Sequence, residues 1–225
     1  MAPMIPRIVV IIPAFNAAAY LPELIDRINR QVAAADLLVI DDGSVDNTAE
    51  VIKALGCHSI VFPENRGKGA ALKAGFSHAV QHGYDAVITI DADLQHRPEH
   101  LPLFYAGLDH ADLLIGTRAI DPRIMPFERR LTNNLTSLII SIFGSCRIRD
   151  SQSGYRLIKT VVLQRFHLTS VRYDTESEML FQTGYLGFTV GEVPIDTVYA
   201  GSRSFINPFK DTTRFIRQIW RRLWY

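Results

Sequence analysis

The chain has 225 residues, of which 48% are hydrophobic and 21% charged, and its formal net charge is +1. This length and composition suit one large globular domain, or such a domain with a small appendage, and exclude a disordered protein. The near-neutral charge argues against a nucleic-acid partner, because dedicated nucleic-acid binders usually carry a strong basic excess.

The first half of the chain alternates short apolar runs with helical patterns. Strands are expected over residues 7–12, 37–40, 59–62, 86–90 and 112–115. Helices are expected after Asn16, which can cap the first of them, over 46–55, from the "NRGKG" stretch to about Gln81, and from Pro98 onward. Such alternation predicts an α/β fold whose mostly parallel sheet carries helices on both faces.

The second half is less regular. Residues 131–146 hold no charge, and their asparagines and hydroxyls favour a packed core helix over membrane contact. A helix is expected in "YDTESEMLFQTGYLGF" and a strand in "TVGEVPI". No apolar run reaches the roughly 18 residues that a membrane span needs.

Two aspartates follow the fourth strand in the stretch "TIDADLQ". In an extended chain, Asp91 and Asp93 would point to the same face, and paired carboxylates repel unless a cation lies between them. A hard divalent cation is the usual partner, and Gln95 adds a neutral oxygen ligand. The alternative is a solvated turn that leads into the helix at Pro98.

Other polar groups end neighbouring strands. Because ligands of parallel α/β sheets bind beyond the carboxyl ends of the strands, Pro13, Asp41, Asp42 and Asp91 are expected on one rim. A carboxylate of "DDGSVDNT" can accept a hydrogen bond from a base or ribose. Taken alone, this stretch favours the simpler interpretation, a helix cap at Ser44 or Asp46.

The "NRGKG" stretch offers backbone freedom and one lysine at the start of a helix. This combination is consistent with contact between Lys68 and an anion, such as a phosphate. It is not a Walker loop, because the spacing differs and no Ser or Thr follows Lys68.

Seven stretches follow one another along the chain in an order that matches a known enzyme family. They are "VVIIPAFN", "VIDDGSVDNT", "NRGKGAALKAG", "IDADLQ", "GTR", "DSQSGYRL" and "EVPI". Over about residues 7–210 the chain resembles glycosyltransferase family 2, in the branch of dolichyl-phosphate mannose synthases and bacterial polyprenyl-phosphate glycosyltransferases. The resemblance implies a Rossmann-like GT-A fold. It also implies inverting sugar transfer from a nucleotide-diphosphate sugar, such as GDP-mannose or a UDP-hexose.

The resemblance also assigns residues to the donor site. It places Pro13, Phe15, Ile40 and Asp42 in the nucleotide pocket. It assigns the metal and the diphosphate to four positions, Asp91, Ala92, Asp93 and Gln95. A Mg²⁺ or Mn²⁺ ion held there would neutralise the departing diphosphate as a Lewis acid, which makes Asp91 and Asp93 catalytic.

The acceptor is expected to be a lipid phosphate. Such a group needs no general base, because its second pKa lies near about 6, but it needs cations to hold it. Arg118, Arg129 and Arg203 are available, and Asn133 stands where many relatives have Ser. Surface ion pairing is the alternative for any one arginine. Two other functions stay open: a hydroxyl acceptor with Asp150 as base, or a silent sugar-nucleotide-binding protein.

The C-terminal segment differs from the rest of the chain because it is basic and amphipathic. Residues 1–200 are expected to form the catalytic domain and 201–225 a basic amphipathic helix, in which Trp220 lies on the apolar face. Such a helix can lie on a membrane surface or dock on its own domain. With two cysteines and no cleavable signal, the chain is expected to be cytoplasmic, with peripheral attachment to the inner face of the membrane.

Overall fold

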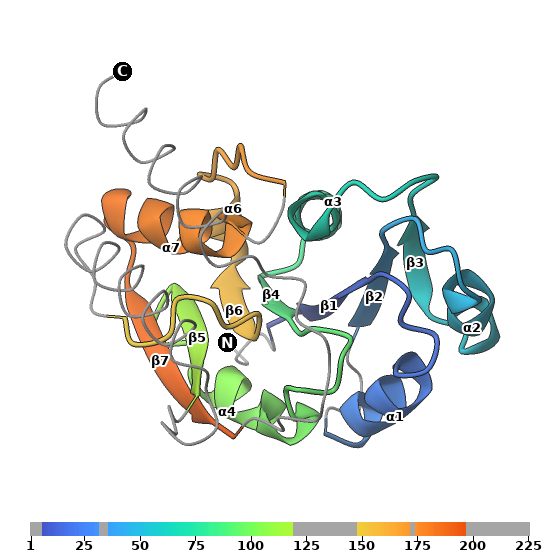
Figure 1. Ribbon diagram of the computed structural model, residues 1–225. Coiled ribbons are helices and arrows are strands. Elements are labelled where there is room, and N and C mark those ends of the chain that lie inside the picture. The colour runs from blue at the N-terminus through green and yellow to red at the C-terminus, as the bar shows by residue number, and fades with distance from the viewer. Residues whose placement is uncertain (1–5, 32–35, 119–147, 172–173, 197–225) are drawn as a thin grey trace, which may run out of the picture.

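The computed structural model describes residues 6–31, 36–118, 148–171 and 174–196. Within these ranges the chain forms one seven-stranded sheet of order β3-β2-β1-β4-β6-β5-β7 (Figure 1). The strands are β1 (Ile8–Ala14), β2 (Asp36–Asp41), β3 (His58–Val61), β4 (Ala86–Thr89), β5 (Leu113–Arg118), β6 (Arg156–Lys159) and β7 (Val190–Ile195). The helices are α1 (Leu21–Gln31), α2 (Thr48–Ala54), α3 (Lys68–Gln81), the 3₁₀ turn η1 (Pro98–His100), α4 (Leu101–Ala106), α6 (Thr160–Leu163) and α7 (Asp174–Tyr185).

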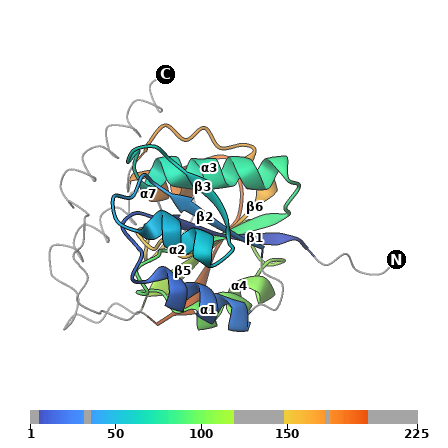
Figure 2. The same ribbon diagram turned by 90° about the vertical axis from the view of Figure 1, so that its right-hand side faces the viewer.

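Helices cover both faces of the sheet, as the sequence predicted. Helices α1, α2 and α4 lie on one face and α3, α6 and α7 on the other (Figures 1 and 2). Strand β1 is buried on both sides, since Val10 and Ile12 pack into the first core and Val9 and Ile11 into the second. This explains why its sequence is continuously apolar and does not alternate.

The carboxyl ends of the central strands meet at one rim. In the register of β1 with β2, Pro13 pairs with Ile40 and Ala14 with Asp41, so the two strands end together. Strand β4 ends beside them, where Thr89 pairs with Ile11. The expected rim is therefore present in the fold.

Strand β6 is the antiparallel exception in the mostly parallel sheet that the sequence predicted. It runs antiparallel between β4 and β5, and Arg156 at its first position pairs with Thr89 at the end of β4. Because β6 runs in the opposite direction, the segment that precedes it lies at the rim. Gly154 of the "DSQSGY" motif is thereby brought next to Asp91.

The start of α1 differs from the prediction. Asn16 does not cap this helix, which begins at Leu21 after a turn at residues 18–20. Asn16 has a positive φ of 51°, and its side-chain oxygen accepts the N–H of Val45 at 3.0 Å. Its own N–H donates to the hydroxyl of Ser44. Asn16 therefore ties the end of β1 to the turn that follows β2.

Several predictions fall outside the described residues. These are the helix over 131–146, the segment 201–225 with Trp220, and three acceptor residues, Arg129, Asn133 and Arg203. Among the helices that the structure describes, none combines the length and the apolar character required to cross a membrane.

Candidate active site

The two aspartates lie just beyond the carboxyl end of β4. Asp91 follows the strand, but Asp93 lies in a turn, and Leu94 has a positive φ of 58°. The Asp93 carboxylate accepts the N–H of Gln95 at 3.1 Å, which closes this turn. The extended geometry from which the pair was predicted is therefore wrong for Asp93, although both side chains do reach the rim.

The two carboxylates repel each other there. Burial raises the pKa of Asp93, and the negative charge of Asp91 raises it further. The carboxylates of Asp91 and Asp93 and the amide oxygen of Gln95 are hard oxygen ligands, so the residue types fit Mg²⁺ or Mn²⁺. In the described part of the chain, no group of three or more His, Cys, Asp or Glu side chains is arranged to hold a metal ion.

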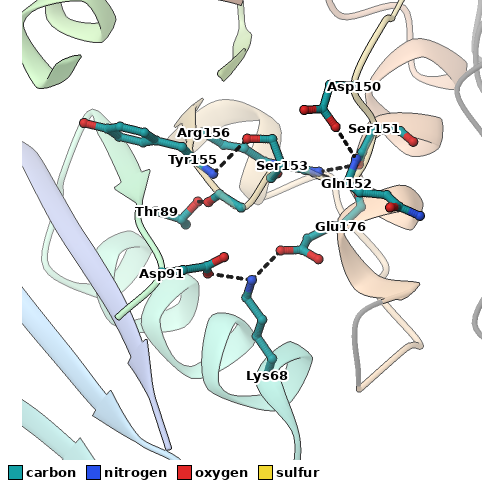
Figure 3. A network of polar contacts seen from close by, with 11 residues as sticks. Lys68, Thr89, Asp91, Asp150, Ser151, Gln152, Ser153, Tyr155, Arg156 and Glu176 are labelled. Carbon is teal, nitrogen blue, oxygen red and sulfur yellow. Dashed lines mark hydrogen bonds and ion pairs between the residues drawn. The ribbon is translucent and has the colours of Figure 1, made fainter. Parts of the chain in front are cut away.

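Lys68 joins Asp91 to a second acid that the sequence did not single out. Its ammonium lies 2.6 Å from Asp91 Oδ1 and 2.6 Å from Glu176 Oε1 (Figure 3). Burial disfavours the charged ammonium, but Asp91 and Glu176 outweigh this and raise the pKa of Lys68. Lys68 is therefore a charged group placed between two carboxylates at the rim.

The start of α3 is held by hydrogen bonds to the end of β2 on one side and to the segment before α7 on the other. The Asp42 carboxylate accepts the N–H of Arg66 at 2.7 Å and that of Gly67 at 2.9 Å. Gly67 has a φ of +95°, which favours glycine at this point. On the other side, the N–H of Gly69 donates to the carbonyl of Val171 at 3.0 Å. These hydrogen bonds on both sides of Lys68 fix the position of its backbone.

Arg156 lies fully buried behind the site. Its guanidinium donates to the carbonyls of Ser151 and Ser153, each at 2.8 Å, and to that of Glu176. Burial lowers the pKa of Arg156, and the nearby carboxylates, including Asp91, oppose this shift. One buried cation therefore joins the loop before β6 to the first turn of α7.

The loop before β6 packs directly on the acidic site. A Cβ atom on Gly154 would lie 2.4 Å from Asp91 Oδ2, so any other residue here would displace the Asp91 side chain from its present position. The Thr89 hydroxyl donates to the carbonyl of Gly154 at 2.7 Å and holds the loop there. The "SG" of the "DSQSGYRL" motif therefore has a steric reason.

Arg118 and Asp150 form a bidentate ion pair at the end of β5. Nε of Arg118 lies 2.5 Å from Asp150 Oδ2 and Nη2 lies 2.9 Å from Oδ1. Burial alone would raise the pKa of Asp150, but the Arg118 guanidinium holds it below its usual range. Arg118, which was expected to hold the acceptor phosphate, therefore binds both carboxylate oxygens of Asp150, the alternative general base.

The residues expected to line the nucleotide pocket gather at the ends of β1, β2 and β4. Phe15 is 42% exposed just beyond β1, and Pro13 is half-buried. Asp42 and Ala92 are buried at the rim, and the Ile40 side chain lies beneath it in the core. The fold brings these positions together, but whether they bind a nucleotide stays a prediction.

Three residues of the site were not expected from the sequence: Gly154, Arg156 and Glu176. The stretch "DTESE" places several acidic residues at the start of a helix, which is the one sequence signal that includes Glu176. The sequence does not show that Glu176 is buried. Arg156 and Gly154 lie in a quoted motif, and their roles depend on the antiparallel course of β6.

Comparison with known proteins agrees with this geometry. The family model described as "Glycosyl transferase family 2" matches residues 9–166. The chain belongs to glycosyltransferase family 2. The suggested resemblance is confirmed, and glycosyltransferase activity is supported for this family 2 chain.

Three curated relatives are named as enzymes that make lipid-linked sugars. An undecaprenyl-phosphate mannosyltransferase of Micrococcus luteus is 32% identical, over 85% of this chain and 84% of the relative. A polyprenol monophosphomannose synthase of Mycolicibacterium smegmatis is 31% identical, over 84% of this chain and 76% of the relative. A UDP-N-acetylglucosamine–dolichyl-phosphate N-acetylglucosaminyltransferase of Methanococcus voltae is 29% identical, over 85% and 86% of the two chains.

Solved structures confirm the fold. Glucosyl-3-phosphoglycerate synthase of Mycobacterium tuberculosis, in complex with Mn²⁺, UDP and glucosyl-3-phosphoglycerate, superposes with a TM-score of 0.73. Its identity to this chain is 22%, over 96% of this chain and 80% of the neighbour. The predicted GT-A fold is therefore confirmed for the glycosyltransferase domain.

Proposed function

We propose that this family 2 enzyme transfers a sugar, with inversion, from a nucleotide-diphosphate sugar to a polyprenyl phosphate. One observation carries the choice of acceptor: the Asp150 carboxylate is engaged by Arg118 through both of its oxygens. A group held in this way is a poor general base, and a phosphate acceptor needs none. The names of the curated relatives support the same acceptor class.

The donor side of the proposal uses the acidic rim. Asp91, Asp93 and Gln95 would hold a Mg²⁺ or Mn²⁺ ion, which as a Lewis acid would stabilise the charge of the departing nucleoside diphosphate. The mutual repulsion of Asp91 and Asp93 supports a cation at this place. Mn²⁺ in a structural neighbour is consistent with such a cation on this fold.

The nucleotide would lie against the ends of β1 and β2. Phe15 offers an exposed aromatic face, and Pro13 and Asp42 border it, with Ile40 below. Ala92 stands between the two aspartates in the chain, and its small side chain would lie next to the diphosphate. Lys68 would add a positive charge near the diphosphate.

The acceptor phosphate would be held by cations on the other side of the rim. Arg118 presents a guanidinium, 15% exposed, that Asp150 orients. Arg129, Asn133 and Arg203 belong to the same proposal and lie outside the described residues. The basic segment 201–225 would bring the enzyme to an anionic membrane surface, where a polyprenyl phosphate resides.

A pair of variants tests the acceptor. We expect Arg118→Lys to raise the KM for undecaprenyl phosphate about tenfold or more, with little change in the KM for the donor. An ammonium cannot pair with both oxygens of Asp150 and still offer further N–H groups to a phosphate, as a guanidinium can. Asp150→Asn should change this KM in the same direction and leave the pH profile of kcat unaltered. Initial rates measured across pH give both quantities.

The hydroxyl-acceptor alternative makes the opposite prediction. With Asp150 as general base, Asp150→Asn would lower kcat by roughly 10² to 10⁴ and remove the acidic limb of the profile. A catalytically silent binding protein would bind the donor and show no turnover of any donor with either acceptor class.

A further inference from the structure

We propose that Lys68 is a resident counter-ion of the acidic site, and that Glu176 positions it so that Asp91 stays available to a divalent cation. Glu176 is thereby a positioning residue that sets the affinity for the cation without contacting it. This inference rests on the proposed metal site at Asp91 and Asp93.

The geometry places one cation between two acids from separate elements. Lys68 is the first residue of α3, Asp91 follows β4, and Glu176 lies in the first turn of α7 (Figure 3). The ammonium is equally distant from both carboxylates, at 2.6 Å. One positive charge shared in this way leaves Asp91 incompletely neutralised.

The side chains of Asp91, Lys68 and Glu176 differ in their exposure to solvent. The Asp91 side chain is 26% exposed, whereas those of Lys68 and Glu176 are 16% and 5% exposed. An ion from solvent therefore meets Asp91 first, and Glu176 lies behind the ammonium.

The backbone keeps Lys68 close to Glu176. A Cβ atom on Gly69 would lie 2.0 Å from Thr175 Oγ1 and 2.7 Å from the carbonyl carbon of Val171. This close approach of α3 to α7 depends on glycine and puts Lys68 beside the first turn of α7. The Lys68–Glu176 contact therefore follows from the packing of the two helices.

Charge changes on the two residues should act in opposite directions. Glu176→Gln removes the carboxylate that competes with Asp91 for the Lys68 ammonium. The ammonium then neutralises Asp91 more fully, and Mn²⁺ binding should weaken about tenfold. Lys68→Met removes the ammonium and should tighten Mn²⁺ binding by a similar factor. A general loss of structure would weaken binding in both variants.

Mn²⁺ binding to the full-length protein, without nucleotide, tests the inference. The electron paramagnetic resonance signal of free Mn²⁺ gives the dissociation constant for the unchanged protein and for Glu176→Gln and Lys68→Met. Glu178→Gln is the matched control, because Glu178 lies on the same helix, is as deeply buried as Glu176, and accepts hydrogen bonds from Thr169 and Ser170. Its Mn²⁺ affinity should equal that of the unchanged protein.

The outcomes separate this inference from the proposed function. Opposite shifts in Glu176→Gln and Lys68→Met, with no shift in Glu178→Gln, support it. Saturable binding that Asp93→Ala abolishes, but that neither Lys68→Met nor Glu176→Gln alters, would overturn the inference and leave the metal site standing. If Glu176→Gln fails to fold, an unchanged or weaker affinity in Lys68→Met overturns the inference by itself. An unchanged protein without saturable Mn²⁺ binding would overturn both.

Discussion

Asp93→Ala is expected to lower sugar transfer by about 100-fold or more, which corresponds to a loss of about 2.7 kcal/mol or more of charge stabilisation at the leaving diphosphate. The fold should survive, because burial and Asp91 both disfavour the charged Asp93 carboxylate. Its removal therefore relieves repulsion in the folded protein. Initial rates against Mn²⁺ concentration, together with thermal melting by circular dichroism, measure both effects.

Asp109 provides the control for this variant. It is exposed and lies in the turn after α4, away from the rim, so Asp109→Ala should keep normal activity and Mn²⁺ dependence. Near-normal activity of Asp93→Ala would show that the carboxylate does not hold the catalytic metal.

Arg156→Met is expected to have the largest effect on stability, a loss of about 3–5 kcal/mol in the free energy of unfolding. The change removes a fully buried guanidinium that donates to three carbonyls and faces the charge of Glu176. Carbonyls left buried without a donor are costly, and methionine fills only the space of the side-chain stem. Urea unfolding followed by fluorescence measures the difference.

The matched control is Arg165→Met, since Arg165 is exposed. Its free energy of unfolding should stay within about 0.5 kcal/mol of the unchanged protein. A loss below about 1 kcal/mol for Arg156→Met would mean that the three carbonyls find other donors, and that Arg156 does not hold the loop on α7.

Much of the fold could be predicted because its strands are buried on both faces. Strand β1 reads as a continuous apolar run, so its place and its parallel pairing follow from the sequence alone. The convergence of Pro13, Asp42 and Asp91 then follows from the topology of parallel sheets. Strand β6 has four residues and begins with a buried arginine, so no local pattern marks it or its antiparallel direction.

The site was predictable in its chemistry and less so in its contacts. Asp91 and Asp93 were found by residue type and spacing, although a turn, and not a strand, presents Asp93. The contact of Lys68 with Glu176 could not be predicted, because Glu176 lies 108 residues further along the chain. Such long-range ion pairs depend on how helices pack, which a single sequence does not display.

One measurement tests the proposed activity most directly. The purified full-length protein is incubated with radiolabelled GDP-mannose or UDP-hexoses and undecaprenyl phosphate, with Mn²⁺, Mg²⁺ or EDTA, and the organic phase is then extracted. We predict that label from one donor enters the lipid phase as a sugar–phosphate product, only with a divalent cation and only when the lipid carries a phosphate. Transfer to a sugar or lipid hydroxyl in place of undecaprenyl phosphate, or transfer undiminished in EDTA, would contradict the proposal.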